Sequence, residues 1–247
     1  MSPTLLLPGD WTSPNLLVRI LYTIGSDWAL GSEGLVDRVT GAVATVRMGP
    51  ADPELAERMA AHDDPVYPSL TDERVQAIDA HKAVVELSCA DDVAAEEACR
   101  ALLSCGAALV DAGAHAVWVP SGLAHGPERW QSLAAAARSA DPADADGEEE
   151  AAALFRAFVR PISKGPGGWR TVGLPLLGQR EVVVDDEVAE PYAYDVLEAL
   201  GQRLVAGMGL HGGEVLQPGR TGPRLLVSDA ADPDPAADRR VWRVRAL

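Results

Sequence analysis

Residues 83–119, AVVELSCADDVAAEEACRALLSCGAALVDAGAHAVWV, contain the pattern from which the fold class follows. The first six of these residues, Ala83 to Ser88, are a short run of β-forming side chains and predict a strand. The alanine- and leucine-rich run from Val93 to about Val110 predicts one long helix. Ala114 to Val119 predicts the next strand, so this stretch indicates a sheet covered by a helix.

The residues on either side continue this alternation. Asp91-Asp92 can cap the long helix, because acidic side chains favour a helix N-terminus. Upstream, Ala42 to Met48 predicts a strand and Glu54 to Ala61 a helix, whereas the apolar run from Leu16 to Ile24 fits either a strand or a short buried helix. Downstream, Glu128 to Arg138 predicts a further helix.

The second half of the chain is richer in predicted strands. Leu154 to Ser163, Trp169 to Leu174 and Arg180 to Asp185 are β-forming runs joined by glycine turns, a spacing typical of an antiparallel meander. Pro191 then opens a predicted helix to about Val205. One face of that helix is apolar; it consists of Ala193, Val196, Leu197, Leu200 and Leu204. Three short strands complete the chain: Val215-Leu216, Arg224 to Ser228 and Arg240 to Leu247.

These elements predict an α+β fold of mixed, largely antiparallel sheets packed with helices. The N-terminal half alternates helix and strand, and the C-terminal half is a strand meander plus one helix. We expect a single domain over 1–247, with two possible lobes, 1–139 and 150–247, joined by an acidic loop at 140–149. The functional alternative for this acidic loop is a calcium-binding loop, but its acidic residues do not stand at the alternate positions that supply calcium ligands.

Charge limits the choice of partner. The chain has 247 residues, of which 37 are acidic and 21 basic, giving a net charge of −16. A field of that sign repels phosphate backbones and anionic lipid surfaces, so we expect neither a nucleic acid nor a membrane as partner. A basic protein partner is compatible with it, and so is the plainer alternative that the acids keep the protein soluble.

The cysteines do not form a metal motif. Cys89, Cys99 and Cys105 show no CxxC spacing and no accompanying histidine pair, so we expect buried free thiols in a reducing compartment rather than a zinc site. The N-terminal residues 1–10 lack the features of a signal peptide, and no apolar run approaches the ~18 residues of a membrane span. We therefore predict a cytoplasmic protein.

Four segments together resemble the bacterial domain-of-unknown-function family 4261. They are Ala80 to Ser88 with its His-Lys-Ala start, Ala114 to Gly122, Trp169 to Val182, and the helix from Pro191 to Met208 with the glycine-rich segment to Gly222. The chain departs from the family at Gly212-Gly213-Glu214, where a Gly-Asp turn is usual. The resemblance implies an α+β fold and a cytosolic bacterial protein, and it implies no activity and no site residues.

Candidate catalytic groups have structural alternatives. His81 starts a strand, and we expect it to be a structural histidine bonded to a carbonyl. Ser121, His125 and Glu128 have the side chains of a nucleophile, a general base and a group that orients the base. The Gly-x-Ser-x-Gly motif is absent, however. We therefore favour helix capping by Ser121 and ordinary polar loop residues. His211 lies in the glycine-rich segment, which lacks the Gly-Lys-Ser/Thr of a phosphate loop and indicates turns.

Tryptophans are the remaining candidates for a binding surface. We expect Trp118, in an apolar run, to be in the core, and Trp11, Trp28 and Trp169, near turns, to be partly exposed.

The sequence thus favours a non-enzymatic interaction protein whose acidic surface binds a basic partner, as an adaptor or neutraliser in a bacterial conflict or regulatory system. We assign no catalytic, cofactor-binding or metal-binding residue and expect no cofactor. One alternative is a hydrolase with a histidine site assembled in the fold from Ser121, His125 and His211, in which His115 is also tested; another is a structural subunit of a homo-oligomer.

Overall fold

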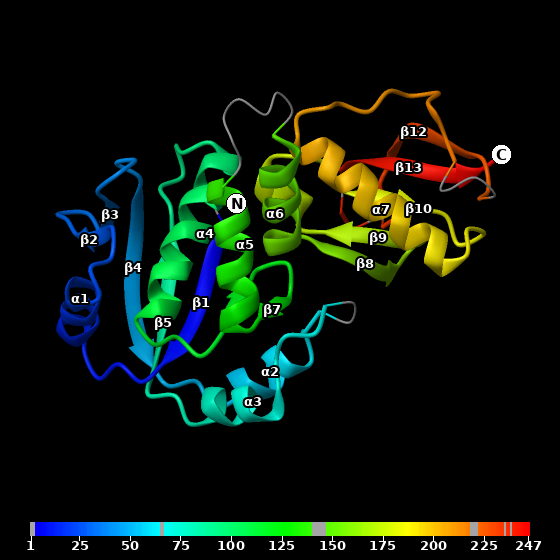
Figure 1. Cartoon of the computed structure of the whole chain (residues 1–247). Helices are drawn as coiled ribbons and strands as arrows, with labels where there is room; N and C mark the ends of the chain where they lie inside the picture. Colours follow the sequence, from blue (N-terminus) through cyan, green and yellow to red (C-terminus); the bar gives the residue numbers. More distant parts are fainter. Residues whose placement is uncertain (1–2, 65–66, 140–146, 218–221, 235, 238) are drawn as a thin grey trace. The chain divides into compact units, whose positions relative to one another are not determined.

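The computed structural model describes residues 3–64, 67–139, 147–217, 222–234, 236–237 and 239–247. The chain divides into two compact units, Met1–Ser139 and Ala140–Leu247. Each unit has its own sheet with helices packed against it (Figure 1). The predicted α+β fold class is confirmed.

The first unit holds a seven-stranded sheet in the order β2-β3-β4-β5-β1-β6-β7. Its strands are β1 (Thr4–Gly9), β2 (Trp28–Leu30), β3 (Leu35–Asp37), β4 (Val43–Pro50), β5 (Ala83–Ser88), β6 (Val117–Val119) and β7 (Leu123–His125). Strand β5 has the predicted bounds and pairs antiparallel with β1 on one side and β4 on the other. Its alternate residues Ala83, Val85 and Leu87 are buried, so one face of the strand faces a packed layer.

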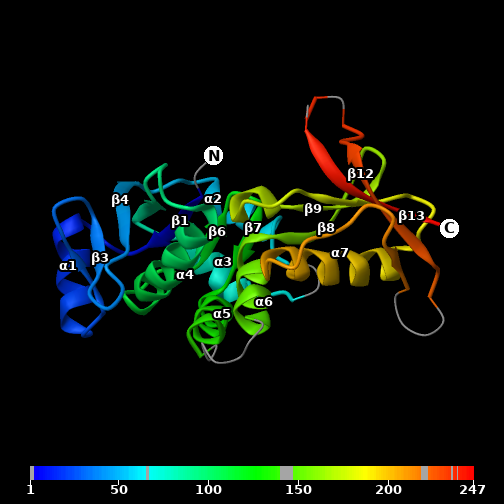
Figure 2. The ribbon, with the colours of Figure 1, turned by 90° about the horizontal axis from the view of Figure 1, so that it is seen from above.

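The helices of this unit are α1 (Pro14–Thr23), α2 (Leu55–Ala60), α3 (Asp72–Asp79), α4 (Ala95–Asp111) and α5 (Pro127–Ser139). Helix α4 contacts β1, β4 and β5 and packs beside α5 (Figures 1 and 2). The ambiguous run at 16–24 belongs to a helix, because the Ser13 hydroxyl accepts a hydrogen bond from the Leu16 amide and Pro14 stands in the first turn.

Two interleaved split β-α-β units organise the middle of the sheet. Strands β1 and β4 both pair antiparallel with β5, so they are parallel to each other with β5 between them, and α1 lies in the chain between them. In the same way β5 and β6 flank β1 and are connected through α4. This is the connectivity of a ferredoxin-like arrangement. The hairpin β2–β3 and strand β7 extend the sheet at its two edges.

Helices α2 and α3 close a second, smaller core. Leu55 and Met59 of α2 are buried together with Ile78 of α3, Ala116 and Ala124. Trp118 packs against this cluster, and so does Val84, which alternates with the buried Ala83 and Val85 along β5. These helices therefore cover part of the second face of the sheet.

The second unit holds a six-stranded sheet in the order β11-β12-β13-β10-β9-β8. Its strands are β8 (Arg160–Gly165), β9 (Gly168–Val172), β10 (Val182–Val184), β11 (Val215–Leu216), β12 (Leu225–Ala231) and β13 (Arg240–Ala246). The predicted antiparallel meander is confirmed for β8, β9 and β10. Strand β10 pairs in parallel with β13, which brings the last strand of the chain into the middle of the sheet.

Its helices are α6 (Glu148–Phe158), the 3₁₀ helix η1 (Leu174–Leu177) and α7 (Glu190–Val205). Helix α7 contacts β8, β9 and β10, and its five predicted apolar positions are buried, as expected. Helix α6 packs against α7. Two predictions were therefore wrong: Leu154 to Phe158 are helical rather than β, and the C-terminal half contains two α-helices rather than one.

The apolar spacing explains why α6 is a helix. Ala151, Leu154, Phe155 and Phe158 recur at helical period and are all buried, and three glutamates stand in the first turn, where the helix dipole favours them. The β-forming residues that follow Phe158 concealed this pattern.

Three local predictions were wrong. The residue that caps α4 is Ala94, without a side-chain bond, rather than an aspartate. Trp11 and Trp28 are 2% exposed rather than partly exposed, because each indole N–H finds a hydrogen-bond acceptor, the Ala112 carbonyl or the Ser104 hydroxyl. Trp118 is half-buried rather than in the core.

Among the described helices, none is both long enough and apolar enough to cross a membrane.

Candidate functional site

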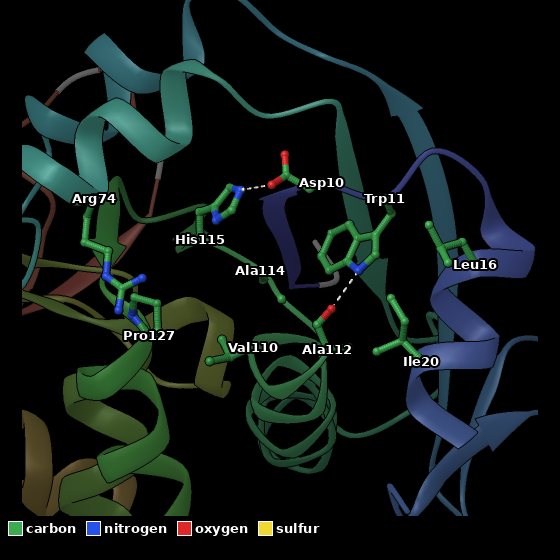
Figure 3. Close-up of a pocket in the computed structure, with 11 residues that line it drawn as sticks. Asp10, Trp11, Leu16, Ile20, Arg74, Val110, Ala112, Ala114, His115 and Pro127 are labelled. Carbon is green, nitrogen blue, oxygen red and sulfur yellow. Dashed lines mark hydrogen bonds and ion pairs between the residues drawn. The ribbon is translucent and has the colours of Figure 1, made fainter. Parts of the chain in front are cut away.

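A pocket of about 410 Å³ lies at the end of β1 in the first unit (Figure 3). The backbone fixes its polar corner: the His115 amide donates to the Pro8 carbonyl at 2.8 Å, and Gly9 forms an isolated antiparallel bridge with Ala114. These contacts place the side chains of Asp10 and His115 next to each other. The Nε2 atom of His115 lies 3.5 Å from the Asp10 carboxylate.

Trp11 forms the floor of this pocket. Its indole N–H donates to the Ala112 carbonyl at 2.8 Å, which anchors the ring to the end of α4. The ring lies directly over Gly9, where a Cβ would come within 2.5–2.7 Å of ring atoms. A side chain at position 9 would therefore displace Trp11.

The other walls come from three helices. Leu16 and Ile20 of α1 and Val110 of α4 supply apolar surface, and Arg74 of α3 supplies a guanidinium. Arg74 is paired with Glu128 at the start of α5. Hydrogen bonding by its own backbone amide, and then by Arg74, lowers the pKa of Glu128. The described lining contains no Ser, Thr or Cys, so Asp10 and His115 have no side-chain nucleophile beside them.

A larger groove, of about 1,020 Å³, lies elsewhere on the first unit. One side of α4 contributes Glu97, Ala101, Ser104, Ala108 and Asp111, which recur three or four residues apart and so share one helix face. The span from Glu97 to Asp111 corresponds to about 21 Å of helix. The walls are residues 24–28, Asp37, residues 39–42 and the last turns of α5. We call this feature the α4 groove.

Acidic groups outnumber basic ones in the α4 groove. Its lining includes four carboxylates, which belong to Asp27, Asp37, Glu97 and Asp111, and the two guanidiniums of Arg100 and Arg138. One of the two guanidiniums, that of Arg100, is already paired with Glu96 on the same helix, at 2.8 Å.

Two of these carboxylates have internal roles. Asp37 accepts from the Val39 amide at 2.9 Å and from the Thr40 hydroxyl at 2.8 Å, which fixes the turn between β3 and β4. Asp111 accepts from Gln131 at 2.9 Å.

Apolar side chains stand in the walls of the same groove. Ile24 is 46% exposed and Val39, in the turn between β3 and β4, is 76% exposed. Exposed apolar side chains next to carboxylates are a common composition of protein-binding surfaces.

The residues named for a hydrolase are not gathered in one cavity of the first unit. His125 is 1% exposed, with its ring 5.4 Å from that of Trp130. The Ser121 hydroxyl is buried without a hydrogen-bond partner among the described residues, so the predicted capping role is wrong. Neither side chain lines the pocket or the α4 groove, whereas His115 lines the pocket. His211 is exposed in the second unit.

His81 is a structural histidine, as predicted. Its Nδ1 is hydrogen-bonded to the Ile78 carbonyl, and its Nε2 accepts from the Asp52 amide at 2.9 Å. With both ring nitrogens engaged and 5% exposure, His81 joins the end of α3 to the start of α2.

Sequence reasoning missed His62. Its Nδ1 is hydrogen-bonded to the Arg58 carbonyl at 2.7 Å, and its ring centroid lies 5.5 Å from that of Trp118. The ring also fills the space beside Gly122, where a Cβ would meet it at 3.0 Å. The sequence indicates the bond to Arg58 only through the spacing of four residues between Arg58 and His62. We assign His62 a packing role.

The cysteines are buried free thiols, as predicted. Burial is the main cause that raises the pKa of Cys89, Cys99 and Cys105, which disfavours the thiolate that nucleophiles and metal ligands need. Within the described residues, no group of three or more His, Cys, Asp or Glu side chains could hold a metal ion. Of the acidic break considered as a calcium loop, residues 140–146 lie outside the described residues, and Glu148 begins α6.

The second unit contains a buried polar cluster with a structural role. Asp232 bonds Arg170 and Arg239, and Glu181 bonds the Thr171 hydroxyl and the Gly173 amide. The bonds of Glu181, which directly precedes β10, join β9 to β10. The bonds of Asp232 join β9 to the β12–β13 connection. In the glycine-rich segment, Gly213 has φ +91°, which supports the turn interpretation.

No family model matches the chain, and no match was found among curated proteins or among solved structures. The resemblance to family 4261 therefore stays a prediction.

Proposed function

We propose that the chain is a non-enzymatic binding protein that docks a basic segment of a partner protein in the α4 groove. Such a protein would act as an adaptor or a neutraliser of that partner. The observation that carries the proposal is the composition of the groove, which is lined by carboxylates from three separate segments together with exposed apolar side chains.

The distribution of charge supports a basic occupant. Residues 1–139 contain 19 of the acidic and 9 of the basic residues, so most of the net charge of −16 belongs to the unit that carries the groove. A negative field of this kind attracts a cationic segment over a Debye length of about 10 Å and raises its association rate. The apolar wall residues then supply short-range contact once the segment is docked.

A defined cationic probe tests this proposal. We expect a lysine- and leucine-containing peptide to bind the full chain in fluorescence anisotropy at low salt, and its affinity to fall as salt rises. A peptide of the same length with glutamate in place of lysine should not bind. Equal binding of the two peptides would show that charge does not select the occupant.

Matched variants locate the site. Asp27 and Glu97 are exposed and line the groove, and Asp27→Asn with Glu97→Gln should weaken peptide binding about tenfold. Glu57→Gln with Asp79→Asn removes the same charge from exposed positions on α2 and α3, outside the groove, and should change affinity less than twofold. Equal effects of the two pairs would contradict docking in the groove.

A further inference from the structure

The floor of the α4 groove is a fixed surface of small side chains. The residues that line it from the middle of α4 are Ala101, Ser104 and Ala108. The Trp28 indole N–H donates to the Ser104 hydroxyl at 3.1 Å, which ties one wall to the floor. Gln131 of α5 donates to the Ala107 carbonyl at 2.8 Å, which holds α5 beside α4 (Figures 1 and 2). The groove is therefore held by contacts within the first unit, and an occupant has to fit its shape.

A helical floor determines which conformation can dock on it. The backbone N–H and C=O groups of α4 bond to one another along the helix, so the floor offers no row of free groups like that of an edge strand. An extended segment lying on this floor would leave part of its own backbone without hydrogen-bond partners. A helix satisfies its backbone internally, and small side chains let two helix axes approach to about 8 Å. This floor therefore favours a helical occupant.

The charges of the groove set the length of that occupant. Glu97 and Asp111 line the groove near opposite ends of α4 and are separated by about 21 Å of helix. A partner helix of about fourteen residues, or four turns, covers the same length. Cationic side chains at both of its ends would meet these two carboxylates. An apolar face between the ends would meet the floor and the exposed wall residues Ile24 and Val39.

We infer that the partner segment of the α4 groove is an amphipathic basic helix of about four turns that lies along α4. Its lysines or arginines stand at both ends, and its apolar residues recur at helical period between them. This partner class rests on the proposed function of the groove, to which it adds a conformation and a sequence pattern.

Two peptides of identical composition separate conformation from charge. Both are long enough for four turns of helix, consist of leucine, alanine and lysine, and have lysine at both ends. One has leucine at helical period, and the other has leucine at every second position between the lysines, which favours an extended chain. We expect the helical-period peptide to bind the full chain about tenfold more tightly in fluorescence anisotropy, because only this peptide forms a continuous apolar face as a helix. Its ¹³Cα chemical shifts should become helical on binding.

The outcomes distinguish this inference from the proposed function. Equal affinity of the two peptides, or tighter binding of the alternating peptide, would overturn the helical partner and still leave a basic segment in the groove. Binding of neither peptide would overturn the proposed function as well. A proline in the middle of the helical-period peptide leaves its charge unchanged but breaks the helix, and it should weaken binding about tenfold.

Substitutions in the floor locate the helix. Ala108→Leu adds bulk on α4 and should weaken binding of the helical-period peptide about tenfold, because the two helix axes can no longer approach closely. Ala108→Ser, which is of nearly the same size, should retain binding. Ala135→Leu adds the same bulk at an exposed position of α5 outside the groove lining and should leave the affinity unchanged. Full affinity of an Ala108→Leu chain with a native spectrum would show that the helix does not lie on α4.

Discussion

Arg170 donates two hydrogen bonds to Asp232, of 3.2 and 2.7 Å, across 62 residues of chain. The two side chains are 9% and 1% exposed, so this is a buried fork-to-carboxylate pair. Arg239 adds a third bond to the same carboxylate at 3.0 Å. The pair joins β9 to the connection between β12 and β13, and these two parts of the chain are far apart in the sequence.

This pair should make the stability of the protein fall in acid. Burial opposes ionisation of Asp232, but the hydrogen bonds that it accepts, first from Arg170, outweigh burial and lower its pKa to about 2. An unfolded aspartate titrates near ~3.9. The stabilisation, about 2 kcal/mol, is therefore present above about pH 4 and is lost as pH falls towards 2. Urea unfolding of wild type and Asp232→Asn between pH 2 and 7 measures it.

We expect Asp232→Asn to cost about 3 kcal/mol at pH 7, because it leaves the buried Arg170 charge unpaired, and less at pH 2. Asp229→Asn is the matched control. Asp229 also contacts two arginines, Arg180 and Arg240, but all three side chains are 40% exposed or more. That change should cost less than ~1 kcal/mol. A cost for Asp232→Asn that does not vary with pH would contradict the pKa assignment.

The sequence predicts local elements better than it predicts such pairings. Strand β5 and helix α7 follow from side-chain periodicity, which depends only on neighbours in the chain. The pairing of Arg170 with Asp232 depends on the β-strand order, and nothing in the local sequence of either residue indicates it. The contact between Asp10 and His115 was not predicted for the same reason. Asp10 follows β1 and His115 precedes β6, and the two residues meet only because these strands pair.

Helix α6 was missed for a different reason. Its apolar positions have helical spacing, but the β-forming residues Val159 and Ile162 follow Phe158 without a turn signal between them, so one predicted segment contained two elements. The exposure of the tryptophans was also misjudged, because a turn in the chain does not imply exposure when the indole N–H has a buried acceptor, as for Trp11. The α4 groove is formed by four separate segments of the chain and could not be derived from spacing.

A glycine in α7 should be intolerant of alanine. Gly201 lies against the ring of Phe155 in α6, and a Cβ there would overlap ring atoms. Alanine in a helix normally gains about 1 kcal/mol over glycine, but overpacking of this kind costs about 1–3 kcal/mol. We therefore expect Gly201→Ala to lower the unfolding free energy, measured in urea.

Gly209 provides the control for Gly201. A Cβ at Gly209 has no atom within 4 Å, and its φ is not in the left-handed region. Gly209→Ala should be neutral or slightly stabilising. If Phe155→Leu is added to Gly201→Ala, part of the lost stability should return, because the smaller side chain leaves room for the methyl group. Additive losses would show that the two residues do not meet.

Glu181 should make stability change with pH in the opposite direction to Asp232. Burial raises the pKa of Glu181, against the hydrogen bonds from Thr171 and Gly173, which lower it. The folded state therefore disfavours the charged form, and stability falls as pH rises from the unfolded value, about 4.3, through the raised folded value. Glu181→Gln should consequently destabilise less at pH 8 than at pH 4. The exposed Glu187, changed to Gln, should show no such difference.

His81 joins two helix ends through its ring, which makes its substitution a test of the second core. Removal of the ring in His81→Ala leaves the Asp52 amide and the Ile78 carbonyl without their partner, at a cost of about 2 kcal/mol. His81→Asn places an amide donor near the Nδ1 position and should keep the bond to Ile78 while losing the bond to Asp52, so its cost should be intermediate. Amide hydrogen exchange at Asp52 should increase in both variants. The exposed His211, changed to Ala, should alter neither stability nor exchange there, and unchanged exchange at Asp52 in His81→Ala would show that Nε2 does not accept this bond in solution.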